Sequence, residues 1–368
     1  MFISTLIFFA ILVFLVLVHE FGHFIVAKWS GIRVDEFAFG FPPKLFGKKI
    51  GETEYKVNLL PIGGYVKIYG EDPNGVAEGS DQKRSFAHKP RYIQALVLLA
   101  GITMNIIFAW VLFSGAYLLG AETSVAAAPE NIKVQNERTA ILNVAKGSPA
   151  DVLGISAGDS LVSLATFKEF LEPKSAQEVS NFVATHQEGQ MTIGYKKKGE
   201  DTVTYSPITP QVYGGADKKI IGLTVDRVGV LDLPVHLALW QGVKTTASYT
   251  ILTAKAFINL IKNIFTGQGG VKELSGPIGI VGVVDQVRVF GIAALFTFAA
   301  IISINLAVLN LIPFPALDGG RLLFVAIESV IRRPLPLVFQ AWANTIGFGL
   351  LLLLMVLVTW QDIARLIS

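Results

Sequence analysis

The chain has 368 residues, of which 52% are hydrophobic and only 16% are charged. With a mean hydropathy of +0.54 it is too apolar for a soluble protein, and most of it is expected to lie in a bilayer. Its net charge of +3 does not indicate a nucleic-acid partner, and the lack of cysteine excludes disulfides and thiolate metal sites. Any metal must therefore be held by nitrogen and oxygen.

The first apolar run, residues 1–27, carries three ionisable residues near its end: His19, Glu20 and His23. Such residues are costly at membrane depth and usually mark function. On a helix, residues four apart project from one face, so both imidazoles can reach one ion, and zinc suits them. Glu20 lies beside them and can act as general base toward a water that the metal acidifies, as in the H-E-x-x-H pattern of zinc peptidases. The alternative is that the two histidines line a polar helix contact.

The run has neither a basic start nor a clear small-residue cleavage site, so we interpret it as a retained span rather than a signal peptide. Residues 28–91 are rich in Lys and Arg, which predicts a cytoplasmic loop and an N-terminus outside the cytoplasm. Within this loop, residues 54–60 and 64–70 alternate in polarity and predict a hairpin split at Pro61. Its second strand either offers an edge beside the metal or belongs to a small surface sheet.

A second span is expected over residues 92–119, with Gly101 and Asn105 on one face as the small and polar residues found where helices approach closely. Residues 121–229 have a different composition and predict one small α/β domain outside the cytoplasm. Its helix is expected at 175–186, and its strands at 139–144, 161–164, 191–196, 202–208 and 220–225.

Residues 235–265 are interrupted by three lysines and predict an amphipathic helix or helix pair on the membrane surface. A third span is expected over 290–312, and it ends in a stretch of prolines and glycines, 310–320, that contains Asp318. Broken backbone at membrane depth is tolerated only where protein buries it or where it lines a water-filled cavity. A fourth span is expected over 338–360.

The predicted fold class is thus a polytopic α-helical membrane protein with about four transmembrane helices and an inserted extracytoplasmic α/β domain. We expect four parts along the chain. Residues 1–120 form a first membrane half with the histidine motif, and 121–229 form the inserted domain. Residues 230–285 form membrane-surface helices with a loop, and 286–368 form a second membrane half.

A catalytic zinc takes three protein ligands, so the two histidines need a third. Asp318 is the best candidate, because it is the acidic residue set into the broken end of the third span. Its competitors His88, His186 and His236 are interpreted as solvated surface histidines. Asp318 could instead serve as the N-cap of a following helix.

Two motifs now carry a resemblance to a known family. They are His19-Glu20-x-x-His23 and, after the third span, Asn310-x-x-Pro313-x-Pro315-x-Leu317-Asp318-Gly319. With the module between them, they resemble the site-2 protease family of intramembrane zinc metalloproteases, in its bacterial RseP-type branch. The likeness covers essentially the whole chain and extends to Gly63-Gly64-Tyr65-Val66-Lys67 and Ser275-Gly276-Pro277-Ile278-Gly279.

The resemblance implies a Zn²⁺ ion held by His19, His23 and Asp318, with Glu20 as general base and Asn310 close to the substrate backbone. It also implies that 121–229 is a PDZ domain, with Gly222 and Leu223 on the strand that offers its edge to a peptide. The chain has room for a single such domain, whereas well-known relatives carry two in tandem. An edge strand with Tyr65, Val66, Lys67 and Ile68 could hold an unwound substrate by strand addition.

The implied substrates are single-pass transmembrane proteins, such as an anti-sigma factor or a signal-peptide remnant. The implied setting is the inner (cytoplasmic) membrane, in contact with lipid, with the active site toward the cytoplasm and the PDZ domain outside. Peptide C-termini are candidate ligands of that domain, and no nucleic acid is expected.

Two functions other than proteolysis fit part of the sequence. An inactive homologue could hold transmembrane clients without cutting them, but it would have no reason to keep Glu20 beside a complete ligand set. A metal transporter would predict repeat symmetry and polar residues along several spans, and the sequence has neither. The sequence therefore favours an intramembrane zinc protease.

Overall fold

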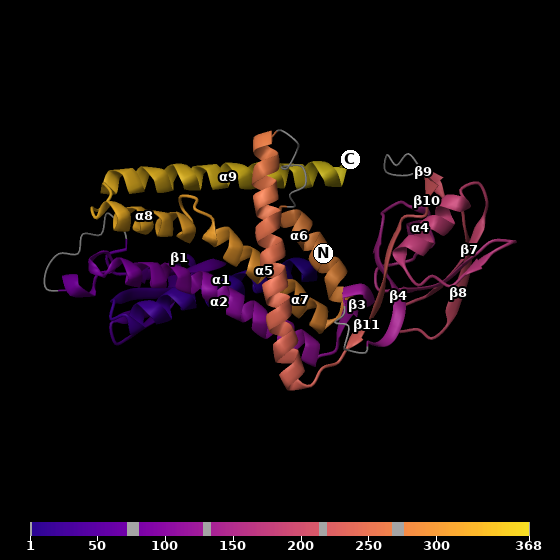
Figure 1. Ribbon diagram of the computed structural model, residues 1–368, viewed down its shortest axis with the longest axis horizontal. Helices are drawn as coiled ribbons and strands as arrows, with labels where there is room; N and C mark the ends of the chain where they lie inside the picture. Colours follow the sequence, from indigo (N-terminus) through magenta and orange to yellow (C-terminus); the bar gives the residue numbers. More distant parts are fainter. Residues whose placement is uncertain (1, 72–80, 128–133, 213–218, 267–275, 368) are drawn as a thin grey trace. The chain divides into compact units, whose positions relative to one another are not determined.

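The computed structural model describes residues 2–71, 81–127, 134–212, 219–266 and 276–367 (Figure 1). The chain forms two compact units. The first consists of Met1–Ser114, Leu239–Val284 and Thr297–Ser368, and the second of Gly115–Ala238 and Asp285–Phe296. The two units are therefore interleaved along the sequence.

Four helices in the described part of the chain are long and apolar enough to cross a membrane. They are α1 (Phe2–Trp29), α2 (Arg91–Leu118), α7 (Ile292–Leu311) and α9 (Leu337–Ile367). Each has the 20 or more residues that a bilayer requires. The four expected spans are confirmed, with ends that differ by a few residues.

A long bulged hairpin follows α1, with strands β1 (Val34–Ile50) and β2 (Thr53–Ile68) paired antiparallel. The chain reverses at Gly51, whose φ of +63° favours glycine. The expected hairpin split at Pro61 is wrong, because β2 runs through Pro61 and its partner is β1. Several register shifts interrupt the pairing. Residues 36–39 of β1 pair with 64–67 on one side and with 54–57 on the other, so β1 lies between the two stretches that were expected to pair with each other.

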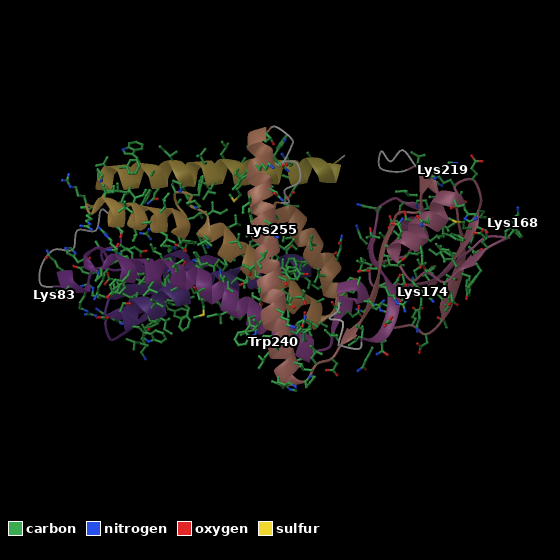
Figure 2. All side chains as sticks on the ribbon, viewed as in Figure 1. Lys83, Lys168, Lys174, Lys219, Trp240 and Lys255 are labelled. Atoms are coloured by element: carbon green, nitrogen blue, oxygen red, sulfur yellow. The ribbon has the colours of Figure 1, made fainter. Side chains whose placement is uncertain are left out.

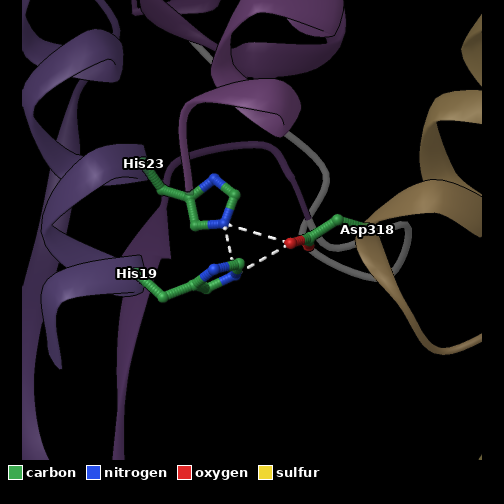
Figure 3. A group of neighbouring side chains, drawn as sticks. All are labelled: His19, His23 and Asp318. Carbon is green, nitrogen blue, oxygen red and sulfur yellow. Dashed lines mark hydrogen bonds and ion pairs between the residues drawn. The ribbon is translucent and has the colours of Figure 1, made fainter. Parts of the chain in front are cut away.

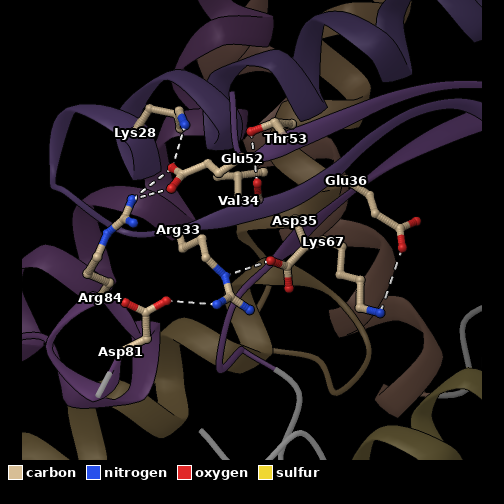
Figure 4. Close-up of polar contacts among 10 residues, drawn as sticks. All are labelled: Lys28, Arg33, Val34, Asp35, Glu36, Glu52, Thr53, Lys67, Asp81 and Arg84. Atoms are coloured by element: carbon tan, nitrogen blue, oxygen red, sulfur yellow. Dashed lines mark hydrogen bonds and ion pairs between the residues drawn. The ribbon is translucent and has the colours of Figure 1, made fainter. Parts of the chain in front are cut away.

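Ion pairs hold the turn of this hairpin at Glu52 and the start of its first strand at Arg33 (Figure 4). The Glu52 carboxylate lies 2.6 Å from Lys28 Nζ at the end of α1 and 2.6 Å from Arg84. Arg33 pairs with Asp81 at 2.8 Å, beside the short helices η1 (Gln82–Arg84) and η2 (Phe86–His88). Hydrogen bonds from Lys28 and Arg84 hold the pKa of Glu52 below its ordinary value, against the opposing effect of burial.

Helix α5 (Val235–Thr266) is a single helix of 32 residues, which settles the choice between a helix and a helix pair. The indole Nε1–H of Trp110 on α2 donates to the backbone oxygen of Leu239 at 2.9 Å. Trp240 and Lys255 lie along α5 in Figure 2, and the Lys244 ammonium lies 5.4 Å from the Trp240 ring centroid. The helix thus combines packing against α2 with the lysines that the sequence pattern indicated.

Two shorter helices complete the first unit. Helix α6 (Pro277–Val287) begins where the buried Asp362 carboxylate of α9 accepts from the N–H groups of Gly276 at 3.1 Å and Gly279 at 2.8 Å. Helix α8 (Asp318–Ile331) is tied by its buried Glu328 to Arg91 at 2.7 Å. Ser275 of the expected glycine-proline motif lies outside the described residues.

The second unit is built on an antiparallel sheet with strand order β3-β11-β4-β5-β7-β8, and β6 pairs with β5. Its core is a cluster of apolar side chains that includes Ile141, Leu164 and Ile193. The strands are β3 (Ala121–Ser124), β4 (Gln135–Val144), β5 (Ser160–Ala165), β6 (Phe170–Leu171), β7 (Met191–Lys196), β8 (Val203–Ile208), β9 (Gln211–Val212), β10 (Lys219–Ile220) and β11 (Leu223–Leu231). The α-helices are α3 (Pro149–Val152) and α4 (Ala176–Thr185), and the short 3-10 helices are η3 (Val125–Ala127) and η5 (Arg288–Phe290).

Most of the expected elements in this unit are confirmed, and one strand is wrong. The helix expected at 175–186 is α4, and the strand expected at 191–196 is β7. The strand expected over 220–225 is divided into β10 and β11, because Gly222 between them has φ +82°. A Cβ there would lie 2.2 Å from the Cβ of Ser148, so this turn requires glycine.

Candidate active site

The two histidines of α1 face the same point, as their spacing predicted (Figure 3). Their Nε2 atoms lie 3.1 Å apart, and both residues are only 7% exposed. Asp318 Oδ2 lies 2.9 Å from Nε2 of His19 and 3.3 Å from Nε2 of His23. The residues expected to form the ligand set therefore converge, although 299 positions separate His19 from Asp318.

Asp318 reaches this point because it is the first residue of α8. The N-cap of that helix is Leu317, which makes no side-chain capping bond, so the N-cap alternative for Asp318 is wrong. The two glycines that follow allow the loop to fold back tightly. A Cβ on Gly319 would lie 2.3 Å from Ile312 O, and one on Gly320 would lie 2.2 Å from Phe314 O.

The convergence of these three atoms fits a metal ion. Two imidazole nitrogens at 3.1 Å with lone pairs facing each other repel unless a cation or proton lies between them. All three donor atoms lie within 4.8 Å of one another. Ligand atoms about 2.0–2.1 Å from a tetrahedral zinc are about 3.3 Å apart, close to the observed spacings. The donor set is two imidazoles and one carboxylate, which zinc accepts.

The competing histidines lie elsewhere. His88 in η2 and His236 at the start of α5 are exposed. His186 follows α4 in the second unit, where its Nδ1–H donates to the backbone oxygen of Phe182 at 2.9 Å. None of the three is part of the His19, His23 and Asp318 group.

Helix α2 shapes the site in ways that the sequence analysis missed. The Nδ1–H of His23 donates to the backbone oxygen of Val97 at 2.8 Å, which leaves Nε2 free to bind a metal. One turn further along α2, Gly101 leaves room for the imidazoles, since a Cβ there would lie 2.3 Å from His23 Nε2. A Cβ on Gly22 of α1 would lie 2.5 Å from Ala100 O, so the two helices pack closely here.

Asn105, one turn beyond Gly101, orients the other imidazole. Its side-chain amide lies 3.3 Å from Nδ1 of His19 and is fully buried. The amide oxygen has no partner when the amide nitrogen faces the ring. Turning the amide by half a turn lets the oxygen accept from His19 Nδ1–H, and Nε2 is again the free nitrogen. Small and polar residues were expected on this face, but their contact with the histidines was not.

Glu20 lies next to the group without being part of it. Its carboxylate accepts a hydrogen bond from the backbone N–H of Val66 on β2 at 3.0 Å. The strand with Tyr65, Val66, Lys67 and Ile68 therefore lies beside α1. Tyr65 donates to Glu36 at 2.9 Å, Lys67 is exposed and Ile68 is buried. Asn310 lies in the last turn of α7, before the loop that leads to Asp318.

Comparison with known proteins decides the family, because the sequence pattern of peptidase family M50 matches residues 7–354. The chain belongs to this family. It is 37% identical to a zinc metalloprotease of Clostridium perfringens, over 96% of this chain and 97% of the relative. It is 31% identical to the regulator of sigma-W protease RasP of Bacillus subtilis, over all of both chains. It is also 31% identical to a zinc metalloprotease of Agrobacterium fabrum, over 98% of this chain and 96% of the relative.

As an M50 peptidase with four described helices long and apolar enough to cross a membrane, the protein is an intramembrane zinc metalloprotease. When bound, zinc polarises a peptide carbonyl and acidifies a water. The converging donors, the adjacent carboxylate and the loop of broken backbone all lie in the first unit of this peptidase.

The second unit of the M50 peptidase contains a groove of about 350 Å³ between α4 and β11. Gly222 and Leu223 line it, together with Val179 and Val183 from α4. Along β11, residues 223–230 pair with β4, whereas β3 pairs with residues 228–231. Among the described strands, the first half of β11 therefore has an unpaired edge, and this edge faces the groove.

Proposed function

We propose that this peptidase cuts single-pass membrane proteins within or near their transmembrane segments, with substrates of the anti-sigma-factor or signal-peptide-remnant type. The observation that carries the proposal is the convergence of the buried His19 and His23, on a membrane-crossing helix, with Asp318 at the start of the helix that follows another such helix. A soluble substrate could not reach such a site without entering the bilayer. The relative in Bacillus subtilis is named as a regulator of a sigma factor.

In this proposal His19, His23 and Asp318 hold the zinc ion, and Glu20 is the general base. His23 Nδ1–H donates to Val97, and with the Asn105 amide turned so that its oxygen accepts from His19 Nδ1–H, each Nε2 would be unprotonated and aimed at the metal. The hydrogen bond from Val66 holds the Glu20 carboxylate beside the ligands. From there Glu20 can take a proton from the attacking water and pass it to the leaving amine.

The substrate must be unwound first, because a helix hides its carbonyls in internal hydrogen bonds. We assign this step to β2, where Tyr65, Val66, Lys67 and Ile68 would pair with the unwound segment as an added strand. The closeness of β2 to Glu20 supports this role, since a segment paired there lies next to the base. Asn310 would contact the backbone of the same segment.

We assign the second unit as a PDZ domain that binds peptide C-termini. The groove between α4 and the unpaired edge of β11, with Gly222 and Leu223 at its wall, supports this role. An extended peptide could add to that edge and place its side chains against Val179 and Val183. Lys219 also lines the groove, and Figure 2 shows it on the surface of this unit.

We further propose that the protein lies in the cytoplasmic membrane, with its active site toward the cytoplasm and the PDZ domain outside. The basic residues that surround the hairpin support this orientation by the positive-inside rule. The division of the chain expected from its sequence, with the inserted domain over 121–229, belongs to the same proposal.

The test is cleavage of a single-pass transmembrane reporter by the purified full-length protein, with Glu20→Gln in parallel and zinc measured on both. We expect cleavage by the wild type, a loss of roughly 10²–10⁴-fold or more in Glu20→Gln, and equal zinc in both proteins. A wild type that holds zinc and cuts no member of a broad reporter panel would favour the client-binding alternative instead.

A further inference from the structure

The loop between α7 and α8, residues 312–317, sets the position of Asp318, and its backbone is irregular. Ala316 has φ +75°, in the left-handed region that residues with a Cβ rarely adopt. Such a conformation persists only where the surroundings hold it in place. The internal bonds of the loop, such as Phe314 N–H to Ile312 O at 2.7 Å, do not involve the Ala316 amide.

Helix α9 supplies the missing contact. The side-chain oxygen of Asn344 accepts a hydrogen bond from the Ala316 N–H at 3.2 Å. Asn344 lies within the apolar stretch Val338–Ala364, which is long and apolar enough to cross the membrane. A polar side chain in such a helix is costly unless it has a partner, and this one has the backbone of the loop.

A second residue of α9 fits the same loop. Gly347 is buried and lies three positions after Asn344, on the same helix face. A Cβ on Gly347 would lie 2.5 Å from the backbone oxygen of Pro315 and 2.7 Å from its Cβ. Because Pro315 and Ala316 are adjacent, the two residues of α9 contact neighbouring parts of one turn.

We propose that Asn344 and Gly347 are positioning residues for Asp318, and that helix α9 thereby sets the third ligand of the metal site. Asp318 follows this turn by two residues, so a shift of the turn moves the carboxylate away from the histidines of α1. The inference rests on the proposed role of Asp318 as a zinc ligand. It gives the fourth span a function in metal binding, although it contributes no donor atom.

The test is zinc affinity of the full-length protein in detergent, measured by competition with a chelator, together with the thermal unfolding of the zinc-free protein. Asn344→Leu removes the acceptor, and we expect zinc affinity to fall by about 10–100-fold, as it does when residues that orient metal ligands are lost. Asn344→Asp keeps an oxygen at the same place and should restore most of the affinity. Gly347→Ala should weaken zinc binding as well.

Matched controls separate positioning from general damage. Gly349→Ala changes a glycine on the same helix whose Cβ would meet open space, and it should bind zinc as the wild type does. If Asn344→Leu and Gly347→Ala lower the unfolding temperature but keep wild-type zinc affinity, their role is structural only and the inference is overturned.

Asp318→Asn distinguishes failure of the inference from failure of the proposed ligand set. Loss of zinc in Asp318→Asn with wild-type affinity in both α9 variants overturns the positioning role alone. Wild-type affinity in Asp318→Asn overturns the ligand set and the inference together. Loss in all three, with affinity restored in Asn344→Asp, supports both.

Discussion

The carboxylate of Glu20 accepts a hydrogen bond from the backbone N–H of Val66, at 3.0 Å. This bond joins the helix that carries His19 and His23, the proposed zinc ligands, to the strand that we assign to substrate. Because the donor is a backbone group, its position follows the path of β2 rather than the rotamer of a side chain. The proposed base and the proposed substrate strand are therefore fixed relative to each other.

The first prediction concerns the reach of Glu20. Glu20→Asp shortens the side chain by one methylene and withdraws the carboxylate from Val66 while keeping its charge. We expect zinc content to be unchanged and the cleavage rate to fall by about 100-fold, because small displacements of a positioned base are costly. Single-turnover cleavage of a reporter measures the rate. An unchanged rate would mean that the contact with Val66 does not position the base.

The second prediction concerns the space beside the imidazoles. Gly101→Ala places a methyl group within 2.3 Å of His23 Nε2 by the present geometry, so the rings or α2 must move. We expect zinc affinity to fall by about 10-fold or more, since displaced ligands bind metal less well. The control is Gly282→Ala on α6, where a Cβ would meet open space. Equal zinc affinity in the two variants would contradict the packing described here.

The third prediction concerns Asn105. Asn105→Leu removes the amide that lies 3.3 Å from His19 Nδ1 while keeping the side chain close to its original volume. We expect zinc affinity to fall by about 10–100-fold and the pH dependence of zinc binding to shift, because the tautomer of His19 is no longer fixed. Chelator competition at several pH values measures both. Asn105→Asp, which keeps an acceptor, should lose less.

The fourth prediction concerns pH and the turn of the hairpin. The pKa of Glu52 is held below its ordinary value of 4.5 by hydrogen bonds from Lys28 and Arg84, so this group stabilises the fold above the ordinary value. The contribution declines as pH falls below 4.5 and through the lower pKa of the folded state. Glu52→Gln should therefore cost about 1 kcal/mol at neutral pH. Thermal unfolding at pH 7 and in acid should show the difference from wild type only at pH 7.

The parts of the site that could be predicted are those set by local geometry or by an unusual residue. The spacing of His19 and His23 fixes their common face on any helix, and Asp318 is an acid in the broken end of a span. Contacts that depend on how helices pack could not be predicted. The roles of Val97 and Asn105 follow from the register of α2 against α1, which no sequence pattern encodes.

In the fold, too, features set locally could be predicted and features set by distant contacts could not. Long apolar runs predicted the spans, because bilayer thickness sets their length. Strand β1 was missed, and its residues 36–39 lie between the two stretches that were expected to pair with each other. The strand expected over 220–225 is broken at Gly222, which has a positive φ and sits where a Cβ would meet Ser148. Both errors come from contacts between segments distant in sequence.

The ligand set is tested most directly by zinc X-ray absorption of the purified protein, with His23→Ala and Asp318→Ala in parallel. We predict a first shell of nitrogen and oxygen at about 2.0–2.1 Å with two imidazoles in the wild type. One imidazole should be lost in His23→Ala, and both should remain with altered oxygen ligation or lower occupancy in Asp318→Ala. An identical spectrum and zinc content in all three proteins would contradict the ligand set of His19, His23 and Asp318.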